Sequence, residues 1–459
     1  MTTNSLFTEF DQQSAKAWKQ KIQVDLKGAD YNETLIWQSL EGIHVKPFYH
    51  ADDFKANFTA IPGQPTSWEI CQEIFIDDVA IANHIATDAI ERGAEAILLV
   101  VEKEFDVAKL FHQMNLSETS VHFKFHFLDA EFIKKLHRYL SASNVKTFYN
   151  IDLLGNLSVT GNWYHSIEKD HRILDTLTSE MPSELMLSID ATTSQNAGAN
   201  QVQQLAHALA HANEYLNRMN SQKRDLKQLT ISFKMAVGGN YFFEIAKLRA
   251  MRLLYATLAK EYNANEHCHI MAVPTTRDKT IYDYNVNLLR TTTQYMSAAL
   301  GGADTICSMA YDAIYQKSNE FGARIARNQL LIMKAESYLD MVSNAADGSY
   351  YIESLTEQLA EKALILFKEI EANGGYLKQL KEGNIQRKIK ESAQKEQQLF
   401  DEGTLVLLGT NKHPNPADKM KESLELYPFL KINKRQTILV PIIARRLSEQ
   451  LEKERLDHE

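Results

Sequence analysis

Acidic side chains stand at the ends of several β-rich runs of this sequence. Glu102, Asp152 and Asp190 each occupy or follow the last position of such a run. If these runs are parallel strands, their carboxyl ends meet on one face, where two carboxylates could act as general acid and general base. Carboxylates at strand ends also cap helices and pair with arginine. We favour this structural role.

The histidines and cysteines offer less chemistry. None of the fifteen histidines falls at the end of a β-rich run, which argues against proton-transfer catalysis. His207 and His211 have the spacing of two metal ligands on one helix face, but no acidic ligand is nearby, so we expect them to be structural or surface residues. His267 and His269 lie at the start of a predicted strand. Catalytic residues would lie at the opposite, carboxyl ends of the strands. The sequence therefore predicts no metal site.

Three cysteines occur, at positions 71, 268 and 307, without C-x-x-C spacing. We expect reduced, buried thiols rather than a disulfide framework.

Gly238 and Gly239 before a predicted helix resemble a phosphate cradle. A tight turn that needs glycine for its backbone angles is the interpretation we prefer. Gly301 and Gly302 are expected to end a helix.

The elements that would position these residues alternate regularly. Eight short apolar or β-rich runs are expected to be strands: 68–74, 94–101, 121–127, 146–151, 185–189, 229–236, 269–274 and 304–309. Stretches with helical spacing lie between most of them: 79–92, 130–143, 202–219, 242–262 and 281–300. This alternation predicts an α/β fold, a (β/α)8 TIM barrel, with a doubly wound open sheet as the alternative. The strand–helix pattern is weakest over residues 104–120, where the third unit is expected.

Three regions are expected along the chain: an arm over 1–60, the barrel over 61–345, and a helical extension over 346–459. Helices are predicted over 321–341 and 351–372, and an amphipathic helix over 435–459. The arm spreads apolar residues through polar sequence, and such residues must be buried against the barrel or a partner. We predict a subunit interface formed by Trp18, Leu26, Leu35 and Trp37.

Composition and net charge exclude some classes of protein. The 459 residues are 44% hydrophobic and 24% charged, with a formal net charge of −9. A nucleic-acid-binding protein needs a basic surface, which this composition does not provide. The chain has no signal-peptide pattern and no 18-residue apolar run, so we expect a cytoplasmic protein without a membrane segment.

Several stretches resemble the methylmalonyl-CoA mutase family. Residues 231–236 with 239–250 (GNYFFEIAKLRA) are similar to its sixth strand and helix. Further similar stretches are 195–199 (QNAGA), 287–293 (NLLRTTT), 299–304 (ALGGAD), 321–328 (FGARIARN) and, in the arm, Trp18, 25–28 (DLKG), Trp37 and 41–43. The resemblance implies a barrel that threads the pantetheine of acyl-CoA along its axis, beneath a separate domain that carries adenosylcobalamin. It also implies that the extension over 346–459 ends where such a cobalamin-binding domain would begin.

The sequence departs from the catalytic pattern of this family at three positions. Thr193 stands where the turn after strand five carries a histidine, Glu73 replaces a tyrosine after strand one, and Cys307 replaces a histidine in strand eight. No histidine has an aspartate two residues before it, as the family's axial-ligand motif requires. The resemblance therefore implies no catalytic residue and no bound cofactor in this chain.

The expected function is that of a small, non-catalytic subunit of an adenosylcobalamin-dependent mutase that interconverts succinyl-CoA and methylmalonyl-CoA. Adenosylcobalamin and acyl-CoA would bind to a homologous large subunit. One alternative is a substrate-binding half that works with a separate cobalamin-domain protein. Another is a barrel adapted to a different acyl-CoA or phosphate ligand.

Overall fold

Eight parallel strands form the centre of the protein in a computed structural model that describes residues 9–54, 58, 60–181, 186–430 and 435–459. In chain order they are β3 (Glu69–Phe75), β4 (Ala96–Val101), β5 (Ser120–Phe125), β6 (Thr147–Phe148), β7 (Ser188–Asp190), β8 (Ser232–Val237), β9 (His269–Pro274) and β10 (Thr305–Ser308). They are hydrogen-bonded in the order β6-β5-β4-β3-β10-β9-β8-β7. Sequential strands are therefore neighbours, and the first strand pairs with the last, as in a (β/α)8 barrel.

The two outer strands of that order also meet. Ile151 and Leu187 form a parallel bridge, in which the Ile151 N–H donates to the Met186 carbonyl at 2.9 Å and the Ser188 N–H donates to the Ile151 carbonyl at 3.2 Å. This bridge joins the β6 side to the β7 side. The predicted barrel is confirmed, and the doubly wound alternative was wrong. The first residue of the predicted fifth strand, Leu185, lies outside the described residues.

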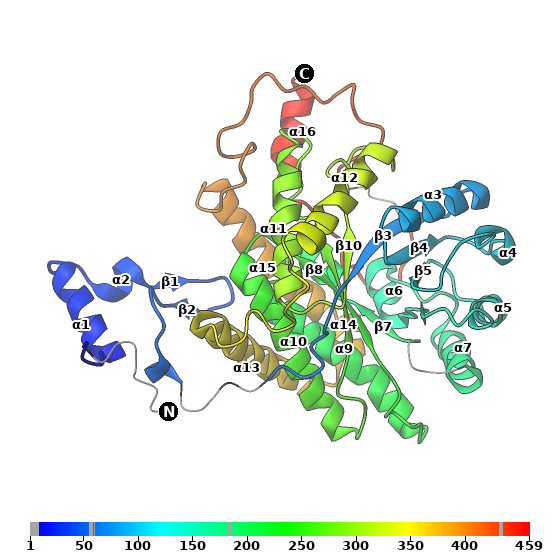
Figure 1. The fold of residues 1–459 in the computed structure, drawn as a ribbon, viewed down its shortest axis with the longest axis horizontal. Helices are drawn as coiled ribbons and strands as arrows, with labels where there is room; N and C mark the ends of the chain where they lie inside the picture. Colours follow the sequence, from blue (N-terminus) through cyan, green and yellow to red (C-terminus); the bar gives the residue numbers. More distant parts are fainter. Residues whose placement is uncertain (1–8, 55–57, 59, 182–185, 431–434) are drawn as a thin grey trace.

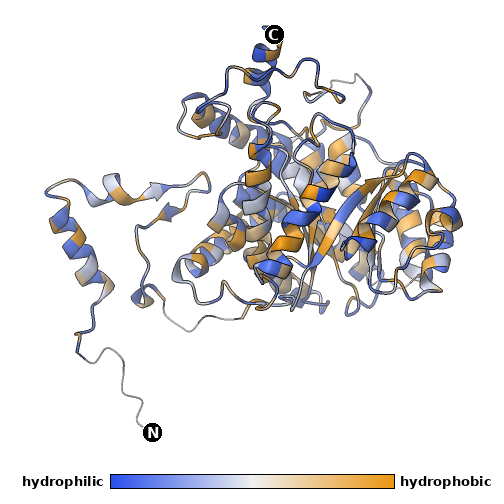
Figure 2. Ribbon diagram, turned by 45° about the horizontal axis from the view of Figure 1, so that its top comes forward, coloured by the Kyte–Doolittle hydropathy of each residue, from blue (hydrophilic) through white to orange (hydrophobic). Residues whose placement is uncertain are grey.

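Helices surround the strands (Figure 1). They are α3 (Val79–Glu91), α4 (Val107–Leu110), α5 (Ala130–Ser141), α6 (Leu153–Thr160), α7 (Ile167–Glu180), α8 (Thr192–Asn196), α9 (Gln201–Ser221), α10 (Tyr241–Glu261), α11 (Val286–Leu300) and α12 (Glu320–Leu331). Four of them, α3 to α6, begin at an aspartate whose carboxylate accepts backbone N–H groups of the first turn. The weak third unit contains only the single turn α4. Apolar residues dominate the strands (Figure 2).

Residues 9–54 form an arm that extends from one side of the barrel (Figure 1). Its elements are α1 (Ala15–Asp25), α2 (Tyr31–Leu35), β1 (Trp37–Gln38), β2 (His44–Val45) and the 3-10 turn η1 (Ala51–Asp53). β1 and β2 pair as an antiparallel hairpin, and Ile43 and Val45 are buried in the main core. No residue of α1 is buried. The arm is therefore attached to the barrel through its hairpin.

Helices continue after the barrel. The end of α12 passes into a π-helical turn, η2 (Ile332–Glu336), so the predicted helix over 321–341 stops short of its expected end. α13 (Tyr350–Ala372), α14 (Tyr376–Lys381), α15 (Asn384–Asp401) and α16 (Glu449–Asp457) follow. α13 packs against α9 and α10 on the outside of the barrel. No helix in the described part of the chain has the length and apolar character needed to cross a membrane.

The helix predicted over 435–459 is wrong for most of its length, because only α16 is helical. Residues 437–448, which we call the strap, are irregular and lie on the barrel. Their N–H groups bond to barrel carbonyls: Ile438 to Gly161, Ile442 to Ser158, Arg445 to Asn196 and Leu447 to Arg277, at 2.8–2.9 Å. Pro441 lies within the strap and has no N–H to continue a helix. The sequence alone therefore already argued against a helix through Pro441.

Candidate functional site

The carboxyl ends of the strands surround a small cavity, which we call the mouth. It has a volume of about 210 Å³ and includes Lys124, Asp190, Thr193 and Lys234 in its lining. Asp190 of β7 and Lys234 of β8 are paired in the register of the two strands. This is the face of a (β/α)8 barrel that carries active sites in enzymes of this fold.

Opposite charges balance one another in the mouth. Burial alone would raise the pKa of the Asp190 carboxyl, but the ammonium groups of Lys234 and Lys124 outweigh it and lower this pKa. Burial would lower the pKa of Lys234, yet the carboxylates of Asp190 and Glu73 raise it. Both groups are therefore charged near neutral pH, and neither is poised to exchange a proton.

Two of the three predicted strand-end acids bond to backbone N–H groups, and Asp152 is the N-cap of α6. Asp152 accepts the Gly155 N–H at 2.8 Å at the start of α6, and it also accepts the Asp190 N–H at 2.9 Å and the Tyr215 hydroxyl at 3.0 Å. Asp190 accepts the Thr192 N–H at 3.1 Å. Asp152 therefore has the capping role that we favoured for these carboxylates. Glu102 lies 3.7 Å from His126, which follows β5 and lines the mouth. The expectation that no histidine falls at a strand end was therefore wrong.

The three positions that differ from the catalytic pattern lie around Lys234. Thr193 lines the mouth with it, and Glu73 and Cys307 are near enough for their charges to affect its pKa. Glu73 is exposed, whereas Cys307 is buried. The structure thus brings Thr193, Glu73 and Cys307 to one end of the barrel. Lys234, which the sequence analysis did not single out, lines the same cavity as Thr193.

The barrel axis below the mouth is filled by apolar side chains. Cys71, Ala96, Leu98, Met271 and Cys307 form a buried cluster, and each is at most 2% exposed. Leu98 and Met271 also line the mouth, so they form its floor. A pantetheine chain threaded along the axis would have to displace these side chains.

Aromatic rings fill the axis at the opposite end. His122 is fully buried and stacks on Phe148 with ring centroids 4.0 Å apart, and the His269 ring lies 4.4 Å from Phe148. Burial lowers the pKa of both histidines well below the usual value. Neutral imidazoles therefore pack here as core residues.

The stretch 239–250 that resembles the mutase family supplies a buried polar network. Lys247 Nζ lies 2.5 Å from Glu244 Oε2 and donates to Gln195 Oε1 at 2.9 Å, to Gln204 Oε1 at 3.0 Å and to the Ala236 carbonyl at 2.7 Å. The Lys247 side chain is fully buried. These contacts tie α10 to α8, to α9 and to the end of β8, so this network supports the framework of the barrel.

Gly238 and Gly239 adopt no unusual backbone angles, so the predicted requirement for glycine φ values was wrong. Neither has a positive φ. A Cβ at Gly238 would lie 2.9 Å from Gln195 Nε2, whereas at Gly239 the nearest atom would be 3.9 Å away. Gly238 is therefore needed for space. Gly302, in contrast, has a φ of +79° just after α11, and the predicted helix end is confirmed.

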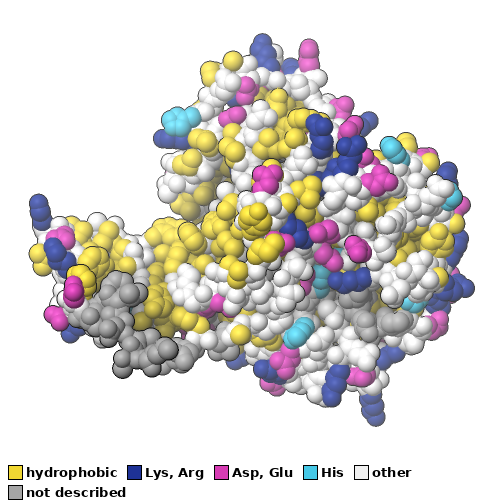
Figure 3. All heavy atoms as spheres, in the orientation of Figure 1, with side chains coloured by type: hydrophobic (Ala, Val, Ile, Leu, Met, Phe, Trp, Pro, Cys, Tyr) yellow, Lys and Arg dark blue, Asp and Glu magenta, His cyan; other side chains and the backbone are white. Residues whose placement is uncertain are grey.

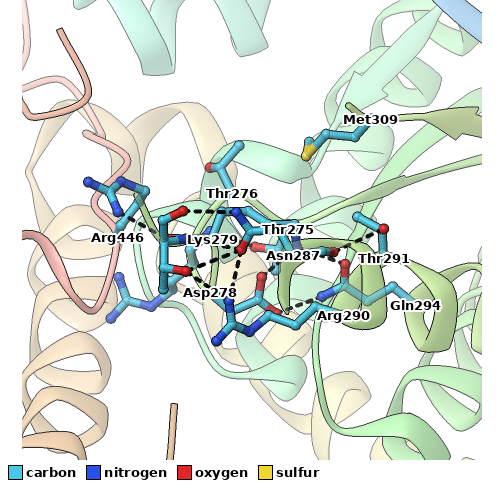
Figure 4. A network of polar contacts seen from close by, with 12 residues as sticks. Thr275, Thr276, Asp278, Lys279, Asn287, Arg290, Thr291, Gln294, Met309 and Arg446 are labelled. Atoms are coloured by element: carbon cyan, nitrogen blue, oxygen red, sulfur yellow. Dashed lines mark hydrogen bonds and ion pairs between the residues drawn. The ribbon is translucent and has the colours of Figure 1, made fainter. Parts of the chain in front are cut away.

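The second resembling stretch, 287–293, holds the loop after β9. Asn287 accepts the Thr280 N–H at 3.1 Å and donates to the Thr280 carbonyl at 2.8 Å, and Arg290 donates to the Asn287 side chain at 2.8 Å (Figure 4). Arg446 of the strap donates to the Lys279 carbonyl at 2.9 Å. The network thus fastens the strap to the strand-end face.

A larger cavity of about 710 Å³ lies between the barrel and the arm. Its walls include the arm residues 37–41, Gly238 and Gly239 after β8, and residues 404–408. Glu41 of the arm lies inside it and accepts the Gln201 N–H at 3.3 Å. Burial raises the pKa of Glu41, and Glu244 adds to this effect. The cavity therefore lies where the arm contacts the barrel.

His207, His211 and the three cysteines are packed in the interior, whereas His267 is exposed. The His207 and His211 rings are buried, and the His211 ring stacks on Tyr376 at 5.1 Å. The three cysteines are free and buried. In the described ranges, no group of three or more His, Cys, Asp and Glu side chains is arranged to hold a metal ion.

The four predicted interface residues fall into two environments. Trp37 is half exposed, but its ring packs edge-on against Phe243 of α10 at 5.6 Å. Leu35 and Leu26 are partly buried. Trp18 of α1 is 53% exposed and contacts the ring of Phe48, which also belongs to the arm. Hydrophobic side chains gather on the surface where the arm meets the barrel (Figure 3).

Comparisons with known proteins agree with the fold. The family model described as methylmalonyl-CoA mutase matches residues 99–457. A methylmalonyl-CoA mutase small subunit of Porphyromonas gingivalis is 32% identical over 92% of this chain and 73% of its own length. A methylmalonyl-CoA mutase of Cereibacter sphaeroides is 29% identical over 89% of this chain and 66% of its own.

A methylmalonyl-CoA mutase large subunit of Porphyromonas gingivalis is 31% identical over 60% of this chain and 40% of its own length. The chain thus spans between two fifths and three quarters of these three relatives. A mandelate racemase/muconate lactonizing enzyme from Roseiflexus sp. matches 55% of this chain and 57% of its own with 15% identity, and its TM-score of 0.23 supports no further argument. The match of the family model over most of the barrel and the similarity to the small subunit establish that this chain belongs to the methylmalonyl-CoA mutase family.

Proposed function

We propose that this chain is the small, non-catalytic subunit of a heterodimeric, adenosylcobalamin-dependent methylmalonyl-CoA mutase. Its role is to stabilise a homologous large subunit that carries the acyl-CoA and cobalamin sites. The observation that carries this proposal is the filled barrel axis. Cys71, Leu98, Met271 and Cys307 occupy the space that a pantetheine chain would need.

The mouth also lacks the groups that the reaction requires. Thr193 and Glu73 cannot replace the histidine and tyrosine that the family pattern places there, because neither offers a neutral donor of the same reach. Each missing contact to a developing charge is worth about 3–4 kcal/mol in comparable sites. With all three contacts changed and the axis closed, turnover by this barrel is not expected.

The strand-end face does not fit adenosylcobalamin. The strap covers the ends of α6 and α8 and the loop after β9, through bonds from Ile442, Arg445 and Leu447. No histidine of the chain follows an aspartate at the axial-ligand spacing. We therefore assign the cofactor to the partner and derive no step of the reaction in this chain. The net charge of −9 provides no basic surface for nucleic acid, and we propose a cytoplasmic location for the complex.

Activity of the separated and combined chains tests the proposal. The purified chain with adenosylcobalamin and methylmalonyl-CoA should form no succinyl-CoA above a control without protein. A homologous large subunit from the same genome should be active, and adding this chain should raise its thermal stability. Turnover by this chain mixed only with a separate cobalamin-domain protein would instead favour the substrate-binding-half alternative.

A single restored residue gives a sharper test. Thr193→His should remain inactive, because residues that act together contribute in a strongly non-additive way. Thr192→His, which also lines the mouth, is the matched control. Activity of Thr193→His alone would contradict our interpretation of Glu73, Cys307 and the filled axis.

A further inference from the structure

Three sulfur-containing side chains meet inside the barrel. Cys71 of β3 and Cys307 of β10 are direct partners in the parallel register, so their side chains project from the same face of the sheet. Each is at most 1% exposed, and Met271 of β9 packs in the same cluster. Their Cα atoms are paired across the two strands, and both side chains belong to one buried cluster. Two thiols and a thioether thus lie together in a site that neither the mutase reaction nor the proposed subunit role uses.

We propose that Cys71, Cys307 and Met271 bind a soft monovalent cation, Cu(I) or its analogue Ag(I), in the centre of the barrel. Thiolate and thioether ligands select Cu(I) over harder ions. The other members of the cluster, Ala96 and Leu98, offer no oxygen or nitrogen ligand. Zinc needs about four such ligands, and calcium or magnesium needs oxygen. The composition of the site therefore favours Cu(I).

The charge of the bound state can be balanced. Binding converts both thiols to thiolates and releases two protons to solvent, while copper stays in the Cu(I) state. Two thiolates and one Cu(I) carry a net charge of −1. The Lys234 ammonium lies within electrostatic reach of both Cys71 and Cys307. A cation on Lys234 therefore offsets the charge that would otherwise be left in the core.

A route to the site also exists. The mouth, with a volume of about 210 Å³, reaches down to Met271 and Leu98. Met271 is therefore in contact with both the mouth and the two cysteines. An ion that enters at the strand ends meets the thioether first and then the thiols.

Competition for Cu(I) tests this proposal on the full chain. The protein is purified reduced and without oxygen, and three free thiols are verified after unfolding. Titration against a coloured Cu(I) chelator should show one tightly held equivalent, and X-ray absorption should show sulfur ligands only. Cys71→Ser and Cys307→Ser should each weaken binding at least about a hundredfold, and Met271→Leu about tenfold. Cys268→Ser is the matched control, because Cys268 is equally buried but belongs to another cluster, and it should bind normally.

Protection of the native protein from alkylation gives a second readout that does not depend on the variants folding. One equivalent of Ag(I) should protect Cys71 and Cys307, but not Cys268, from a thiol-alkylating reagent under partly denaturing conditions. Peptide mass spectrometry locates the modified residues. The proposal is wrong if the reduced protein takes up no Cu(I), if uptake survives both serine substitutions, or if Ag(I) protects all three cysteines equally.

Discussion

Arg446 Nη1 lies 2.6 Å from Glu452 Oε2, and the two side chains are 5% and 0% exposed. Arg446 belongs to the strap and Glu452 to α16. Glu452 also accepts the Ile281 N–H at 3.0 Å, and Arg446 donates to the Lys279 carbonyl. One buried ion pair therefore joins the strap to α16, and both partners also bond to the backbone of the loop after β9.

We expect Arg446→Ala to lower the free energy of unfolding by about 3–5 kcal/mol, because it leaves the Glu452 carboxylate buried without its partner. Chemical denaturation followed by circular dichroism measures this change. Arg387→Ala is the matched control, since Arg387 pairs with Glu391 at 2.9 Å on the surface. An exposed pair contributes at most about 1 kcal/mol. Equal losses in the two variants would contradict the structural role of the buried pair.

Gly238→Ala should destabilise the protein by about 1–3 kcal/mol, the range for added atoms in a packed site. The new methyl group would lie 2.9 Å from Gln195 Nε2. Gln195 cannot move freely, because its Oε1 accepts from Lys247. Gly239→Ala, with 3.9 Å of free space, should be neutral or slightly stabilising. Thermal unfolding of both variants distinguishes a need for space at Gly238 from a general need for glycine in this turn.

His207 should make stability depend on pH. Burial lowers the pKa of His207 to about 4 in the folded protein. The unfolded histidine has a pKa near 6.5, so below that pH the unfolded chain binds a proton that the folded protein does not. The contribution is fully present above about pH 6.5 and is lost as the pH falls toward 4, for a total of about 3 kcal/mol.

His207→Leu should reduce the slope of the unfolding free energy against pH between about pH 4 and pH 6.5. The exposed His413 provides the control, and His413→Gln should leave the slope unchanged. Chemical denaturation at a series of pH values between 4 and 7 gives both curves. A slope that persists without His207 would assign the effect to His122 or His269, whose pKa values are lowered too.

The two tryptophans of the arm should have separable effects. Deletion of residues 1–28 should leave the melting temperature of the isolated chain unchanged, because no residue of α1 is buried, but it should weaken association with the large subunit at least about tenfold. Trp37→Ala should instead lower the melting temperature, since Trp37 packs on Phe243.

Trp18→Ala and Phe321→Ala form a matched pair for the binding measurement, because the two side chains are 53% and 54% exposed. Only the first should weaken association, measured by surface plasmon resonance or analytical ultracentrifugation. If both leave it unchanged, α1 is not the contact with the partner.

Local sequence predicted most strands and several helices of the barrel to within a few residues, but it did not predict α6, α7 or α8. Strand β9 was predicted at its observed bounds, and α3, α5, α9 and α10 nearly so, because hydrophobic period and aspartate caps are written into neighbouring residues. The same kind of signal, Pro441, should have excluded the helix across the strap. The family resemblance likewise marked Thr193, Glu73 and Cys307 as unusual.

Only the tertiary structure decided what those residues face. Lys234 meets Asp190, Glu73 and Cys307 because β3, β7, β8 and β10 converge on one end of the barrel, and these strands are separated by long stretches of chain. Cys71 and Cys307 are neighbours because the first strand pairs with the last, at 236 residues' distance between Glu69 and Thr305. Closing a sheet into a barrel creates contacts between residues that share no local sequence pattern. The filled axis, and the sulfur cluster within it, are consequences of that closure.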